Sequence, residues 1–163
     1  MKAAVVETNV LVVANQKASH ASPDCILACI NILESLRRRT IIVIDNNWHI
    51  FKEYNRYACM SGQPGAGDFF FKWLYQNQCV DTHCEQVAIT PRTHDSNDFL
   101  EFPSTPDLNS FDRADRKFAA VALTSSKKPT VINATDSDWW LFRRALRKHG
   151  LKIKFLCPEI KSK

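Results

Sequence analysis

The chain has 163 residues, of which 45% are hydrophobic, so it can bury the core of one domain, and we take residues 1–163 as that single domain. Lysine and arginine outnumber aspartate and glutamate by 22 to 17, and the resulting net charge of +5 suits a polyanionic partner without requiring one. No apolar run approaches the ~20 residues that cross a bilayer, and Glu7 interrupts the first run before it could serve as a signal peptide. We therefore expect a cytoplasmic protein with no membrane partner.

The first half of the chain alternates short apolar runs with segments of helical spacing. The run at 2–6 predicts a central strand, because every residue after Lys2 is apolar. Ser22-Pro23-Asp24 has the residues of a helix start, namely an N-cap, a proline at the first position and an early acid. The expected elements are a strand at 2–6, helices at 8–14 and from 23 to about 39, a strand at 40–44, and a helix capped by Asn46 or Asn47 that reaches about Met60.

The second half continues this alternation after a glycine-rich connector at 61–67. Residues 91–110 contain three prolines and many polar residues, so we expect an irregular segment that rims the site. The expected elements are an aromatic helix starting near 69, strands at 86–90, 129–133 and 151–156, and helices at 112–124 and 137–149. This order predicts an α/β fold, a three-layer α/β/α sandwich with a mainly parallel central sheet.

Six cysteines are scattered along the chain: Cys25, Cys29, Cys59, Cys79, Cys84 and Cys157. A chain of this length folds without covalent cross-links, so we expect free thiols. Cys25 and Cys29 fall four residues apart on an expected helix, where buried thiols pack as small apolar groups.

Acidic residues occur at four places, three of which follow apolar runs of strand length. They are Glu7, then Asp45 with Glu53, then Asp112 with Asp115, and finally Asp136 with Asp138. Ligand sites in open parallel sheets lie outside the carboxyl ends of the strands, so we expect these acids to converge. Neighbouring carboxylates repel one another by up to ~4 kcal/mol per pair at an effective dielectric near 20, and a divalent cation relieves this repulsion.

Each acid also has a structural interpretation. Asp112, Asp115, Asp136 and Asp138 fall near helix starts, where negative charge is favoured. Thr135-x-x-Asp138 fits a capping box, Asp45 could end a strand, and Glu53 could be a solvated helix residue.

Taken in order, the motifs resemble those of the PIN-domain nucleases over roughly residues 2–157. Val5-Val6-Glu7-Thr8-Asn9-Val10-Leu11 resembles the first motif, in which aspartate is usual where this chain has Glu7. Glu53 stands at the place of the helical glutamate, and residues 115–122 resemble the third motif, in which an aspartate opens a helix. Residues 130–138 resemble the fourth motif, a strand that runs into Thr-x-Asp-x-Asp.

The resemblance implies hydrolysis of a phosphodiester by water activated on Mg²⁺ or Mn²⁺. Four residues would be catalytic and would hold the metal directly or through water: Glu7, Glu53, Asp115 and Asp136. Asp138 is a further candidate ligand, with helix capping as its alternative. Asn9 and Thr135 would orient a ligand or water, or else form caps and turns.

Two arginines on the expected helix at 137–149 are candidates for substrate binding. Arg143 and Arg147 lie one turn apart and could contact successive phosphates, although a solvated basic face is the alternative. The basic residues at 37–39 and 127–128 precede expected strands, which places them at the opposite edge of the sheet from the acids.

The sequence thus predicts a metal-dependent nuclease, an endoribonuclease of the toxin, RNA-processing or defence type, with RNA preferred to DNA. The alternative is a catalytically weakened PIN-like module that binds nucleic acid or a protein partner, which the replacement at Glu7 favours. Phosphotransfer on an aspartate fits the topology but not the motifs. The resemblance is also compatible with a protein inhibitor, a larger complex or a homodimer.

Overall fold

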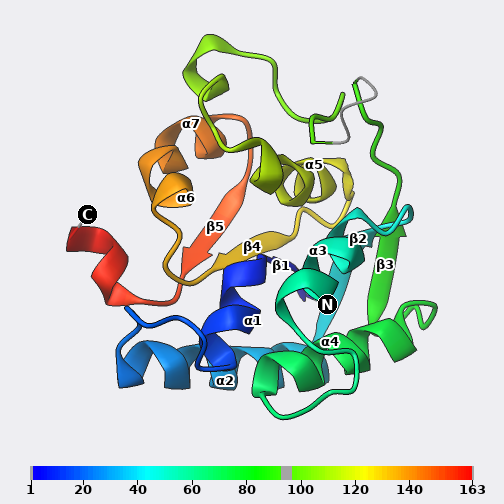
Figure 1. The fold of residues 1–163 in the computed structure, drawn as a ribbon. Helices are drawn as coiled ribbons and strands as arrows, with labels where there is room; N and C mark the ends of the chain where they lie inside the picture. Colours follow the sequence, from blue (N-terminus) through cyan, green and yellow to red (C-terminus); the bar gives the residue numbers. More distant parts are fainter. Residues whose placement is uncertain (1, 93–96, 163) are drawn as a thin grey trace.

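The chain folds around an open sheet of five parallel strands in the order β3-β2-β1-β4-β5 (Figure 1). This computed structural model describes residues 2–92 and 97–162. The strands are β1 (Lys2–Val6), β2 (Thr40–Asp45), β3 (Cys84–Val87), β4 (Thr130–Asn133) and β5 (Lys152–Phe155). The first strand is central, as predicted, because its buried apolar residues are covered on both faces.

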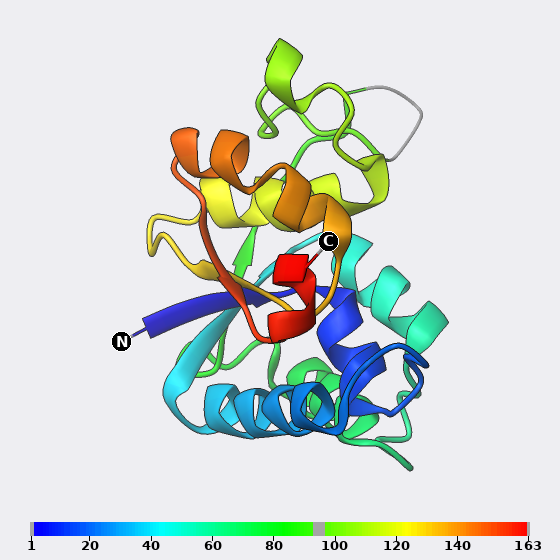
Figure 2. The same cartoon turned by 90° about the vertical axis from the view of Figure 1, so that its left-hand side faces the viewer.

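Helices cover both faces of the sheet, which confirms the three-layer α/β/α sandwich (Figure 2). One layer contains α1 (Thr8–Ala14), α2 (Pro23–Arg39) and α4 (Ala66–Asn77), which pack against one another. The other contains α5 (Arg116–Thr124), α6 (Ser137–Leu141) and α7 (Arg143–Lys148). The short α3 (His49–Tyr57) packs against α1, α5 and β2. Within the described ranges, the structure has no helix long and apolar enough to cross a membrane.

The start of α3 differs from the prediction that Asn46 or Asn47 caps it. The carboxylate of Asp45, at the end of β2, accepts hydrogen bonds from the backbone N–H groups of Asn47, His49 and Ile50 at 2.9–3.0 Å. Trp48 then enters the helix in the left-handed conformation, with φ at 66°. Asp45 is buried, and its carboxylate oxygens accept hydrogen bonds from the backbone at the start of α3, so it caps this helix. It does not line the acidic site.

Two expected elements of the second half are altered. The helix predicted at 137–149 is divided at Phe142, whose ring packs edge-on against Phe111. The irregular segment contains a short 3₁₀ turn, η1 (Pro106–Leu108), and residues 93–96 lie outside the described residues. The described part of this segment does not line the acidic pocket. The segment packs around Arg116. The guanidinium of this residue donates hydrogen bonds to the carboxylate of Asp98 at 3.1 Å and to the backbone carbonyl of Asn109 at 2.9 Å.

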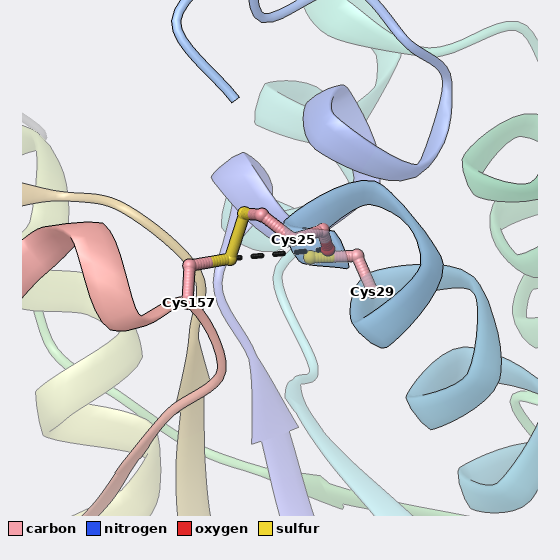
Figure 3. Close-up of side chains that lie close together, drawn as sticks. All are labelled: Cys25, Cys29 and Cys157. Carbon is pink, nitrogen blue, oxygen red and sulfur yellow. Dashed lines mark hydrogen bonds between the residues drawn. A yellow bond between two sulfur atoms is a disulfide. The ribbon is translucent and has the colours of Figure 1, made fainter. Parts of the chain in front are cut away.

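The prediction that every cysteine is free is wrong for two of the six. Cys25, in the first turn of α2, forms a disulfide with Cys157, which follows β5 (Figure 3). The partners are 132 residues apart, so spacing alone could not indicate the pair. Cys29, Cys59, Cys79 and Cys84 are free, and Cys29 is buried as predicted.

Packing of α1 onto α4 fixes the helix that follows Glu7. The buried carboxylate of Asp68 accepts hydrogen bonds from Asn15 Nδ2 at 2.9 Å and from the backbone N–H of Cys59 at 2.7 Å. Asn15 Oδ1 in turn accepts from the backbone N–H of Asp68 at 3.0 Å. Gly67 lets the helices approach this closely, since a Cβ there would lie 2.3 Å from the carbonyl oxygen of Leu11.

Gly67→Ala tests this contact, because helix propensity and packing predict opposite signs. Alanine stabilises a helix interior by up to ~1 kcal/mol relative to glycine. The clash with the backbone of α1 is larger, so we expect the free energy of unfolding in urea to fall by about 2 kcal/mol or more. A more stable variant would show that the two helices are not in close contact.

Candidate metal centre

The acidic site lies where the path of the chain changes direction across the sheet. From β1 the chain proceeds outward through β2 to β3, and later returns to the other side of β1 as β4. Such a switch point leaves a crevice outside the carboxyl ends of the two neighbouring strands. Glu7 directly follows β1, and Asp136 comes three residues after the end of β4. The sheet alone therefore brings the first and last acidic motifs together.

Three carboxylates meet at this crevice. Glu7, Glu53 and Asp115 each present a carboxylate oxygen that lies within 4.8 Å of the other two. Glu7 comes from the end of β1, Glu53 from α3, and Asp115 from η2 (Arg113–Asp115), the 3₁₀ turn that leads into α5. Glu7 and Asp115 are 3% and 5% exposed, so water does little to screen their charges. We call these three residues the acidic triad.

Hydrogen bonds from α1 orient two members of the triad. The backbone N–H of Asn9 donates to Glu7 Oε2 at 2.8 Å, so Glu7 also caps α1. The hydroxyl of Thr8 donates to Glu53 Oε1 at 2.7 Å. The hydroxyl of Tyr54, the residue after Glu53, donates to the carbonyl of Val6 at 2.5 Å and fixes α3 against β1.

Burial and mutual repulsion raise the pKa of three carboxyl groups at this crevice, those of Glu7, Asp115 and Asp136. Burial, then the charges of Asp115 and Asp136, raise the pKa of Glu7 well above its usual value. Burial, then Asp136 and Asp112, raise the pKa of Asp115 to about 8. Burial is also the largest cause of the raised pKa of Asp136. Concentrated, poorly hydrated negative charge of this kind is stabilised by a bound cation.

Lys117 is a member of the site that the sequence reading missed. Its ammonium donates to Glu53 Oε2 and to the backbone carbonyl of Ala114, and its side chain is 8% exposed. It therefore supplies a positive charge beside the triad and partly lowers the pKa of Asp115. In the sequence, only its position two residues after Asp115 indicated that it could lie at the site. That indication is weak, because a lysine in the first turn of a helix is usually solvated.

A pocket of about 260 Å³ opens onto the triad. It is also lined by residues predicted to bind substrate or metal, and by others that the sequence did not indicate. The former are Asn9, Thr135 and Asp136, and the latter are His20 and Tyr57; Asp112, one of the acids expected to converge, also lines the pocket. The Nδ2 group of Asn9 is buried and has no hydrogen-bond partner among the described residues, which leaves a donor for a ligand. Its Oδ1 accepts from the backbone N–H of Ala134 at 2.8 Å, so Asn9 also holds the turn that follows β4.

His20 and Thr135 both form part of the wall of the pocket. Nε2 of His20 lies 3.2 Å from the hydroxyl oxygen of Thr135. His20 belongs to the connection between α1 and α2, and no motif in the sequence marked it. It provides a ring nitrogen in the same pocket as the carboxylates.

Asp138 has a different partner from the one predicted. Its Oδ2 accepts from the backbone N–H of Asp112 at 2.7 Å, and the residue does not line the pocket. Asp136, not Thr135, is the N-cap of α6, with its Oδ1 2.8 Å from the backbone nitrogen of Asp138. Asp138 therefore positions the turn before Asp115, and Asp136 caps a helix while it faces the pocket.

The two predicted phosphate contacts lie away from the pocket. The guanidinium of Arg143 stacks on Trp140 at 3.7 Å from the ring centroid and donates to the carbonyl of Trp140 at 2.5 Å. Arg147 is exposed and has Nη2 3.5 Å from the carbonyl oxygen of Ile153. Lys127 and Lys128 line a pocket with Lys2 and Lys152 at the amino edge of the sheet, as predicted.

Comparisons of the chain with protein-family models, with curated proteins and with solved structures found no match.

The raised pKa of Asp115 predicts how the stability of the metal-free protein depends on pH. Its carboxyl group binds a proton more tightly in the folded than in the unfolded chain, so its contribution to stability is full below about pH 4 and is lost as pH rises through about 8. We expect the free energy of unfolding in a chelator to fall over that window, and Asp115→Asn to flatten the fall by on the order of a few kcal/mol. Urea unfolding between pH 5 and 8 measures both. The matched variant Asp81→Asn, which changes an exposed aspartate, should keep the wild-type slope.

Proposed function

We propose that this protein is a divalent-metal-dependent phosphodiesterase, and specifically an endoribonuclease of the PIN-like type. The observation that carries the proposal is the buried acidic triad at the switch point, with carboxylate oxygens within 4.8 Å of one another. The resemblance of four motifs in order supports the same function. A capping or solvated role accounts for single acids, but not for three of them meeting in one pocket.

The donor set fits a small hard cation. All three triad ligands are carboxylate oxygens, which Mg²⁺ and Mn²⁺ prefer to sulfur or nitrogen. Glu7, Glu53 and Asp115 would hold the ion directly, and Asp136 would do so through water from the β4 side. The bound ion would lower the pKa of a water molecule and neutralise charge on the phosphate.

The remaining pocket residues position the substrate and exchange protons. The free N–H of Asn9 can donate to a phosphate oxygen, and the hydroxyl of Thr135, next to His20, can bind water. Asp136 has a raised pKa and faces the pocket, so it can take a proton from the attacking water. Thr8 keeps Glu53 oriented.

The preference for RNA over DNA rests on the resemblance, as do a protein inhibitor, a homodimer and a cytoplasmic setting. Arg143 and Arg147 lie on α7, outside the acidic pocket, so in this proposal they bind a distant part of a long substrate. The net charge of +5 supports a polyanionic substrate.

The first test is a cleavage assay on mixed single-stranded RNA and DNA with Mn²⁺ or Mg²⁺. We expect Asp115→Asn and Asp136→Asn to lower the rate by about 100-fold or more, because each removes a carboxylate that the reaction uses. Both variants should keep the far-ultraviolet circular dichroism of the wild type, since each relieves repulsion in the metal-free site.

Asp81→Asn is the matched control, and it should cleave like the wild type because Asp81 is exposed and distant from the triad. Full activity in Asp115→Asn would contradict the proposal. Unfolding of both site variants would instead assign the acids to structure.

The second candidate function is a weakened module that binds nucleic acid or a protein without cleaving. Lys117 favours it, because an ammonium that pairs with Glu53 competes with a cation for the same carboxylate. Glu7 favours it too. Its side chain is longer than that of the aspartate usual at this position of the motif, which shifts the metal-binding carboxylate by about 1 Å, and site chemistry is sensitive to such shifts.

Lys117→Met separates the two candidates. It removes the competing charge while keeping an apolar stem, so we expect affinity for Mn²⁺ to rise by about tenfold in calorimetry. The metal-free protein should lose about 2–3 kcal/mol of stability because its carboxylates lose their counter-ion. A gain in affinity together with faster cleavage supports a restrained nuclease. A gain in affinity with no cleavage by either protein supports the binding module.

A further inference from the structure

A second cluster of potential metal ligands lies on another part of the fold and has a different chemistry. Cys25 and Cys29 are one turn apart on α2, and Cys157 approaches them from the segment after β5 (Figure 3). The three sulfur atoms lie within 4.8 Å of one another, and all three residues are buried. Two of the sulfurs form the disulfide, so Cys29 is a third sulfur placed directly beside it.

The spacing of these sulfurs fits a tetrahedral metal once the disulfide is reduced. A zinc ion bound by thiolates has Zn–S distances of about 2.3 Å, which places the sulfurs about 3.8 Å apart. Cys29 would need to move by about 1 Å or less, and the two disulfide sulfurs would separate. Three soft sulfur ligands select Zn²⁺ over the Mg²⁺ that suits the acidic triad.

Glu159 is a negative charge near the cluster, but its carboxylate is held by Ser22. It lies in η3 (Pro158–Ser162), two residues after Cys157, and its carboxylate accepts from the backbone N–H of Ser22 at 3.2 Å. Its negative charge also acts on Cys29, where it adds to burial in raising the thiol pKa to about 12. The three cysteine sulfurs therefore supply three of the four ligands of a tetrahedral ion, and the fourth position is left to a water molecule.

We propose that reduction of the Cys25–Cys157 disulfide creates a zinc site in which the thiolates of Cys25, Cys29 and Cys157 bind one Zn²⁺ and a water molecule takes the fourth position. The disulfide takes two electrons and two protons from a dithiol reductant, which itself becomes a disulfide. Zn²⁺ then displaces one proton from each of the three thiols. This site is independent of the proposed nuclease function.

A competing reaction is thiol–disulfide exchange, in which Cys29 would replace Cys25 or Cys157 in the disulfide, and the protonation of Cys29 disfavours it. The attacking species in exchange is the thiolate, whereas the raised pKa of Cys29 keeps this group protonated near neutral pH.

The two states maintain the same cross-link. Either the disulfide or the zinc ion joins the start of α2 to the segment after β5. The preceding connection carries His20, which contacts Thr135 in the wall of the acidic pocket. Only the reduced, metal-free protein lacks the link. The cluster thereby lets the chain keep one structure in both oxidising and reducing surroundings.

Cobalt substitution tests the proposal, because Co²⁺ bound to thiolates absorbs in the near ultraviolet through sulfur-to-metal charge transfer and carboxylate-bound Co²⁺ does not. Protein reduced with a phosphine should develop this band with one equivalent of Co²⁺, and one equivalent of Zn²⁺ should abolish it. The oxidised wild type should show no band, which provides a control without mutation.

Two variants complete the experiment. Cys29→Ser should lower the affinity for Co²⁺ by at least about tenfold and weaken the band, because it removes one thiolate. Cys59→Ser, which changes an exposed thiol outside the cluster, should behave as the wild type.

Absence of the band in reduced wild type would overturn the proposal, as would an equal band in the oxidised protein or full affinity in Cys29→Ser. Asp115→Asn should leave the band unchanged, so failure of the nuclease proposal would be seen separately.

Discussion

The repulsion among carboxylates buried at the switch point is the constraint on which the rest of the structure depends. Glu7 and Asp115 are almost wholly removed from water, and each raises the cost of ionising the other. This repulsion would separate the carboxylates unless neighbouring groups held them in place. Asn9, Thr8 and Lys117 do so with hydrogen bonds and one opposite charge.

Much of the fold and of the acidic site could be predicted, because the sequence patterns that indicate them are local. The bounds of β1, α1 and the start of α2 follow from apolar runs and from Ser22-Pro23, and the structure confirms them. The parallel sheet then brings Glu7 and Asp136 to one edge, since strand ends converge wherever the order of strands reverses. Glu53 and Asp115 were grouped with them through the resemblance, and the structure places both beside Glu7.

What the sequence did not reveal depends on contacts between distant segments. Asp45 caps α3 because β2 directs its carboxylate back over three backbone N–H groups, whereas Asn46 and Asn47 had the better local propensity. Lys117 faces the triad because α5 is buried, and nothing in its neighbours indicates that direction. Cys157 meets Cys25 only after the whole sheet has formed. The identity of the family stays a prediction.

The position of the disulfide divides the chain unequally. The covalent ring from Cys25 to Cys157 contains β2, β3, β4 and β5, whereas β1 and α1 lie outside it. The strand at the centre of the sheet is therefore inserted between two strands of a closed ring, and only non-covalent contacts keep it there. Because that free segment also carries Glu7, its withdrawal would dismantle the acidic site while the ring stayed intact. The central strand of the sheet is thus the one strand that the disulfide does not enclose.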